Sequence, residues 1–160
     1  MNVKILLLKV MIPACFFLYP GFGHAQDLRP LRALYLQAAG SESACRELFA
    51  RAMVKDKGSE AVLIGYSGAA AMLMARFALN PLSKLNWFRR GRDMLDRAIR
   101  MDTGAAELRY LRYCVQLGCP GFLRYNGEVG KDREFLRHFL DVDGDMQLKE
   151  MIRDVLKRED

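Results

Sequence analysis

Residues 80–125 constrain the fold of this chain more than any other part of its sequence. Apolar and small residues recur at helical spacing after the Asn80-Pro81 step, at Leu85, Phe88, Gly91, Leu95, Ala98 and Ile99. Asp102-Thr103-Gly104 then predicts a turn, and a second helical pattern over 105–117 stops at Gly118-Cys119-Pro120-Gly121. This stretch therefore predicts a helical hairpin with tight loops.

The remaining segments carry helical periodicity as well, and no strand pattern competes with it. We expect helices over residues 27–39, 41–55, 60–79, 83–101, 105–117, 132–140 and 146–157, with Asp27, Ser41 and Ser83 as N-caps. Residues 61–75 are uncharged but too short for a membrane span of about 20 residues, which predicts a buried central helix. The fold class that follows is all-α, with about seven helices in stacked antiparallel hairpins.

One short pattern occurs twice in the chain. Leu28-Arg29-x-Leu31-Arg32 returns 80 residues later as Leu108-Arg109-x-Leu111-Arg112. The series Gly91, Leu95, Ala98 resembles the small, large, small residues of a tetratricopeptide repeat, and Cys45, Phe49, Ala52 resembles them again. Thr103 and Lys57 replace the proline of that repeat, and Arg109 replaces an apolar residue.

Residues 60–135 as a whole resemble exported bacterial tetratricopeptide-like proteins of unknown function. This resemblance rests on Asn80-Pro81-Leu82-Ser83-Lys84-Leu85, on Glu107-Leu108-Arg109-Tyr110-Leu111-Arg112, and on Pro120, Phe122, Leu123, Tyr125 and Asp132. It implies a right-handed superhelix of helical hairpins that binds a partner, and it brings no catalytic residues with it.

The first 25 residues have the pattern of a signal peptide. Lys4 and Lys9 precede an apolar run, and Gly23-His24-Ala25 offers the small residues that a signal peptidase recognises. The alternative is lipidation at Cys15. Cleavage after Ala25 leaves one helical-repeat domain over 26–160 and lowers the formal net charge from +6 to +4. Export predicts a periplasmic or secreted protein and makes nucleic acid an unexpected partner.

The sequence predicts no enzyme, cofactor or metal centre. His138 is the only histidine after residue 25, and Cys45, Cys114 and Cys119 lack metal-ligand spacing. Two interpretations stay open for Cys114 and Cys119: a disulfide between them, and small buried thiols.

Asp141-Val142-Asp143-Gly144-Asp145 resembles the start of a calcium loop. Met146 and Ile152, however, stand where an EF-hand needs glycine and a bidentate glutamate. A turn that caps the last helix is favoured, and cation binding stays open.

Arginine and aromatic residues near the hairpins are the candidate binding surface. We expect the first helices to line a groove with Tyr66, Arg109, Arg112 and Tyr113, and the neighbouring turns to add Trp87, Arg90, Arg124 and Tyr125. Packing roles compete with this interpretation for each residue. Most other arginines of 83–101 have an aspartate four residues away.

The function predicted from these observations is a non-catalytic exported scaffold that mediates protein–protein interaction in the cell envelope. The alternative is a structural protein that binds anionic lipid or polymer through a basic face.

Overall fold

The computed structural model describes residues 27–53, 60–142 and 144–159, and within these ranges it contains helices and no strands. The elements are α1 Arg29–Ala38, α2 Glu42–Ala52, α3 Glu60–Met74, α4 Pro81–Met101, α5 Ala106–Leu117, the 3-10 turn η1 Gly121–Leu123, α6 Val129–Leu140 and α7 Met146–Lys157. The all-α prediction with about seven helices is confirmed. The predicted leader over 1–25 and the end of the helix predicted over 41–55 lie outside the described residues.

The helix ends show which capping predictions were correct. The Ser41 side chain accepts a hydrogen bond from the Ala44 N–H at 3.3 Å, as expected for an N-cap. Asn80, rather than Ser83, caps α4: its Oδ1 accepts a hydrogen bond from the Ser83 N–H at 2.8 Å, and Pro81 occupies the first turn. Residues 81–87 are therefore the first turns of a long helix.

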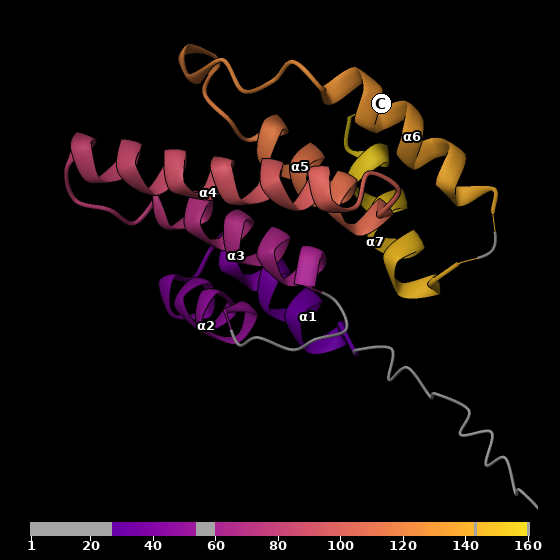
Figure 1. The fold of residues 1–160 in the computed structure, drawn as a ribbon, viewed down its shortest axis with the longest axis horizontal. Coiled ribbons are helices and arrows are strands. Elements are labelled where there is room, and N and C mark those ends of the chain that lie inside the picture. Colours follow the sequence, from indigo (N-terminus) through magenta and orange to yellow (C-terminus); the bar gives the residue numbers. More distant parts are fainter. Residues whose placement is uncertain (1–26, 54–59, 143, 160) are drawn as a thin grey trace, which may run out of the picture.

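Helix α3 is the centre of the fold (Figure 1). It contacts α1, α2, α4 and α5, and most of its residues are buried, so the prediction of a buried central helix is confirmed. Its closest approach is to α4 at Gly68 and Gly91. A Cβ atom at Gly91 would lie 2.5 Å from the Gly68 carbonyl oxygen, so two glycines are needed where these backbones cross. Among the described residues, no helix is both long and apolar enough to cross a membrane.

The other helices lie on either side of the α3–α4 pair (Figure 1). Helices α1 and α2 contact each other and α3, whereas α5 contacts α6 and α7 on the other side. Helix α7 packs its apolar face inward, with Leu148, Met151, Ile152 and Leu156 buried.

Lys149 of α7 is buried, although lysine is mostly a surface residue. Its ammonium donates hydrogen bonds to the carbonyls of Leu140, at 3.0 Å, and Val142. The reason is that these carbonyls at the end of α6 have no helical partner, and a lysine can satisfy them.

Candidate functional site

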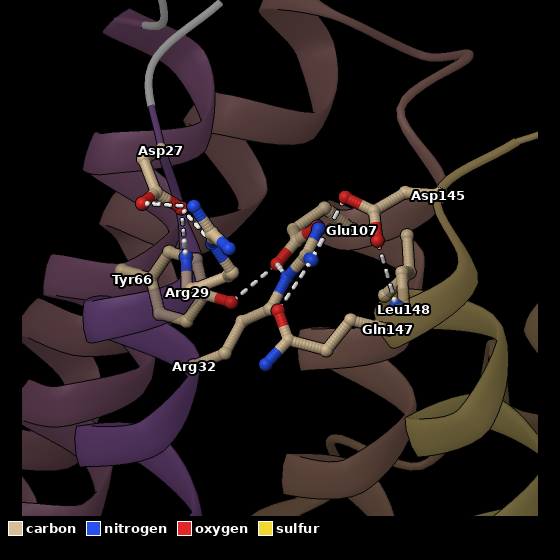
Figure 2. A network of polar contacts seen from close by, with 8 residues as sticks. All are labelled: Asp27, Arg29, Arg32, Tyr66, Glu107, Asp145, Gln147 and Leu148. Carbon is tan, nitrogen blue, oxygen red and sulfur yellow. Dashed lines mark hydrogen bonds and ion pairs between the residues drawn. The ribbon is translucent and has the colours of Figure 1, made fainter.

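A buried arginine, Arg32, connects α1 to α5 and to the start of α7 (Figure 2). Arg32 of α1 is 2% exposed and donates to both carboxylate oxygens of Glu107 in α5, at 2.9 and 2.6 Å. Its Nη1 also donates to Asp145 Oδ2 at 2.8 Å and to Gln147 Oε1 at 2.9 Å, at the start of α7. The Tyr66 hydroxyl of α3 donates to Glu107 Oε1. We call these five residues the Arg32 cluster.

The carboxylates of the Arg32 cluster act on the pKa values of the groups around them. Burial alone lowers the pKa of Arg32, but the hydrogen bonds and charges of Glu107 and Asp145 outweigh burial and raise it. Burial, followed by the charge of Glu107, raises the pKa of the Tyr66 phenol. Tyr66 was predicted to line a binding groove, and this is wrong because its ring is fully buried against Glu107. This cluster holds α1, α3, α5 and the start of α7 together, with its charged groups paired to each other.

A second buried cluster closes the next hairpin. Asp132 of α6 is fully buried and accepts hydrogen bonds from Arg112 Nε and Nη2 at 2.6 and 2.7 Å. Arg109 Nη1 donates to the same carboxylate at 3.0 Å, and its guanidinium lies 5.3 Å from the centre of the Phe135 ring. We call Asp132, Arg109 and Arg112, with Glu128 at 3.9 Å from Arg112, the Asp132 cluster.

The remaining predicted residues lie on other parts of the surface. Arg90 of α4 stacks on two rings, with its guanidinium carbon 5.2 Å from Phe49 and 5.6 Å from Trp87. The Tyr125 hydroxyl donates to Asp96 at 2.7 Å, and Arg124 beside it is exposed with a positive φ of 51°. Trp87 and Tyr125 therefore have the packing roles that competed with a binding role.

The predicted arginine pairs of α4 also differ from what the structure shows. Asp93 pairs with the adjacent Arg92 at 3.0 Å, and Asp96 faces Tyr125, so neither carboxylate is seen bonded to an arginine four residues away.

The eight predicted site residues do not form one groove. Arg112 and Tyr113 are buried, at 8% and 1% exposure, and Arg109 is paired to a buried carboxylate. Helical spacing correctly placed these side chains on one side of α5, but α6 covers part of that side. The interpretation of Tyr66, Arg112 and Tyr113 as exposed anchors is corrected for this reason.

The structure instead shows an apolar groove of about 1100 Å³ elsewhere. Buried rings of Tyr35, Phe88 and Tyr110 from α1, α4 and α5 line it, and Leu36 and Phe122 stand at its edge with 59% and 81% exposure. Further apolar lining comes from Leu85, Val115, Leu117, Leu123 and Val155. We call this the apolar groove, and none of the eight predicted residues lines it.

The thiols of the apolar groove are unsuited to nucleophilic chemistry. Cys114 and Cys119 both line it, and both are free thiols. Burial raises the pKa of Cys114 to about 11, although hydrogen bonds with Tyr110 and Tyr35 act in the opposite direction. Cys114 is therefore protonated at neutral pH, and a thiol is a poor nucleophile.

The acidic turn before α7 has a structural role at its described residues. Asp145 Oδ1 accepts a hydrogen bond from the Leu148 N–H at 3.1 Å and caps α7, as predicted. Asp143 lies outside the described residues. In the described part of the chain, no group of three histidine, cysteine or acidic side chains could hold a metal ion.

Sequence reasoning missed the apolar groove because its lining comes from six separate elements. The nearest sequence signal is Phe122, an aromatic residue just after a helix stop, where no helical stripe accounts for it. Leu36 falls on the polar side of α1 and gives a second, weaker signal.

In comparisons with known proteins, no family model, no curated protein and no solved structure matches this chain.

Proposed function

We propose that this protein is a non-catalytic, exported helical-repeat scaffold that binds another protein in the cell envelope, and that the apolar groove is its binding site. The observation that carries the proposal is the groove itself, because about 1100 Å³ of apolar space is edged by exposed Leu36 and Phe122. Large exposed apolar side chains around a concavity are typical of a surface that a partner covers.

The hairpin arrangement supports the scaffold part of this proposal. Successive helices contact each other as α1 with α2, α3 with α4, and α5 with α6, and α3 also contacts helices of both neighbouring hairpins. Stacked hairpins of this kind suit a tetratricopeptide-like right-handed superhelix. The Arg32 cluster adds a direct link from the first hairpin to the third and to α7. Export to the periplasm or the medium remains part of the proposal through the leader pattern of residues 1–25.

Site-specific photo-crosslinking in the native cell tests the proposal. A photoreactive amino acid replaces Leu36 or Phe122 in the groove, or Met101 as a control, because Met101 is apolar and 45% exposed but does not line the groove. We expect the two groove positions to give the same discrete protein adduct in the envelope fraction and the control position to give none. Equal labelling at all three positions would refute the groove as the binding site.

Salt separates this function from the alternative of a protein that lies on an anionic surface. Binding through an apolar groove should survive 0.5 M salt, whereas adsorption through exposed arginines should be lost, since screening shortens the reach of surface charges to a few ångströms. A protein that leaves the envelope fraction in salt and yields no adduct would support the alternative.

A further inference from the structure

The lining of the apolar groove suits an occupant of a particular shape and charge. Resting on the function proposed above, we infer that the apolar groove holds an amphipathic helix of the partner, and that an acidic end of this helix lies against Arg76 and Lys84.

The size of the groove matches a short helix. A helix about 10 Å across with a pitch of 5.4 Å occupies roughly 420 Å³ per turn. The groove volume of about 1100 Å³ therefore accommodates two to three turns, or about 7–11 residues. Such a helix presents its apolar side chains at i, i+3, i+4 and i+7, which suits a groove lined by rings and aliphatic side chains.

The backbone chemistry of the groove favours a helix over an extended segment. One way to bind an extended peptide is to add it as a strand to a sheet edge, where free N–H and C=O groups pair with its own. The groove is lined by helices and their connections, and the described residues include no strand that could offer such an edge. A helical occupant satisfies its own backbone and needs only side-chain contacts.

The groove has a positive end at the α3–α4 connection. Arg76 follows α3, Lys84 lies in the first turns of α4, and both line the groove. Neither forms an ion pair with another described residue, and both are exposed. The first turn of α4 contains no acidic residue, so the positive end of its helix dipole adds to these two cations.

The opposite side of the groove has a different charge. Asp154 and Glu159, with Arg158 between them, line it from the end of α7, where the helix dipole is negative. In Figure 1 the α3–α4 connection lies at the far left, whereas α7 lies well to the right. A helix with acidic residues at one end is therefore attracted in one orientation, with that end toward Arg76 and Lys84.

Fluorescence anisotropy with three synthetic peptides tests this inference on the full-length chain. Each 12-residue labelled peptide carries the same leucine stripe and differs only in two residues of its last turn, which are Glu, Gln or Lys. Because glutamate in the last turn weakens an isolated helix, tighter binding of the Glu peptide cannot come from greater helicity. We expect Kd to rise from Glu to Gln to Lys, by about three- to tenfold per step at low salt.

Charge-swapped variants locate the effect. R76E/K84E should reverse the order of the three peptides. R89E/R100E makes the same change in net charge on exposed positions of α4 outside the groove, and it should leave the order unchanged.

Each contrary outcome has its own meaning. Equal Kd values for the three peptides, with binding lost in L36E/F122E, would overturn the acidic end but keep the groove as the site. Equal or tighter binding of a peptide with a central proline would overturn the helical occupant in favour of an extended one. If no peptide binds at millimolar concentration, the helix inference fails, and the photo-crosslinking result decides separately whether the groove has a partner.

Discussion

The Arg32 cluster and the Asp132 cluster are built from the same repeated sequence pattern, yet the ions at their centres have opposite signs. Arg32 and Arg112 occupy equivalent positions in the two copies of the pattern, and each donates two hydrogen bonds to one buried carboxylate. Arg32, however, is one cation between two anions, Glu107 and Asp145. Asp132 is one anion between two cations.

The two clusters also differ in reach. The partners of Arg32 lie 75 and 113 residues away, so this cluster ties α1 to α5 and to the start of α7. The arginines that contact Asp132 lie 20 and 23 residues away, in the preceding helix, so this cluster ties α5 only to α6. The same motif can therefore connect two helices of one hairpin or helices of separate hairpins. Which of these it does depends on the helix that supplies the carboxylate.

The largest effect is expected from Arg32→Met. It leaves Glu107, which is 5% exposed, as a buried charge without its cation, and we expect a loss of about 3–5 kcal/mol in the free energy of unfolding. Urea unfolding measures this loss, and hydrogen exchange should show faster exchange in α7 as well as α1. Arg29→Met is the matched control, since Arg29 belongs to the same motif but pairs on the surface, and it should change stability by about 0.5 kcal/mol or less.

A smaller loss is expected from Asp132→Asn. The amide oxygen still accepts one hydrogen bond, and Glu128 lies 3.9 Å from Arg112, so we expect a loss of about 2–3 kcal/mol. Faster hydrogen exchange should be confined to α5 and α6, because this cluster has no partner in α7 among the described residues. Asp141→Asn, at the end of the same helix, is exposed and should be neutral. A loss larger than that of Arg32→Met would contradict the difference in reach.

The smallest effect is expected from Asp145→Asn, which sharpens the comparison through pH. Partial burial raises the pKa of Asp145, but the Leu148 N–H and Arg32 outweigh it, and the net pKa is lowered. A lowered folded pKa means that the carboxylate stabilises the fold above its ordinary pKa of 3.8, and that this stability is lost as pH falls through the folded value. Asparagine keeps the N-cap through its amide oxygen, so the variant removes the charge and the hydrogen bond from Arg32.

Urea unfolding at pH 7 and pH 3 measures this contribution. The Asp145 side chain is half exposed, so we expect the variant to reduce the difference in stability between the two pH values by less than about 1 kcal/mol.

Glu128→Gln is the counterpart in the other cluster. The pKa of Glu128 is lowered mainly by its hydrogen bond with Lys131, so its pH effect should shrink in Lys131→Met. That of Asp145 should shrink in Arg32→Met without disappearing, because the Leu148 N–H still lowers its pKa.

The sequence predicted helix positions better than it predicted exposure. Ser41 as an N-cap and the bounds of α7 follow from local rules of capping and periodicity, which need no knowledge of other helices. Arg109 and Arg112 were read as exposed because arginine is mostly a surface residue. Their partner Asp132 lies in another helix, and the periodicity within α5 does not predict this pairing.

The amino-acid sequence by itself determined that the described part of this chain is helical and that its third helix is buried. These properties depend on local propensity and on apolar spacing within single segments. Only the tertiary structure decided that Arg32 and Arg112 are internal, and that Leu36 and Phe122 edge one groove. The physical reason is that burial and concavity depend on which faces of distant helices meet, and that is settled by packing such as the Gly68–Gly91 crossing.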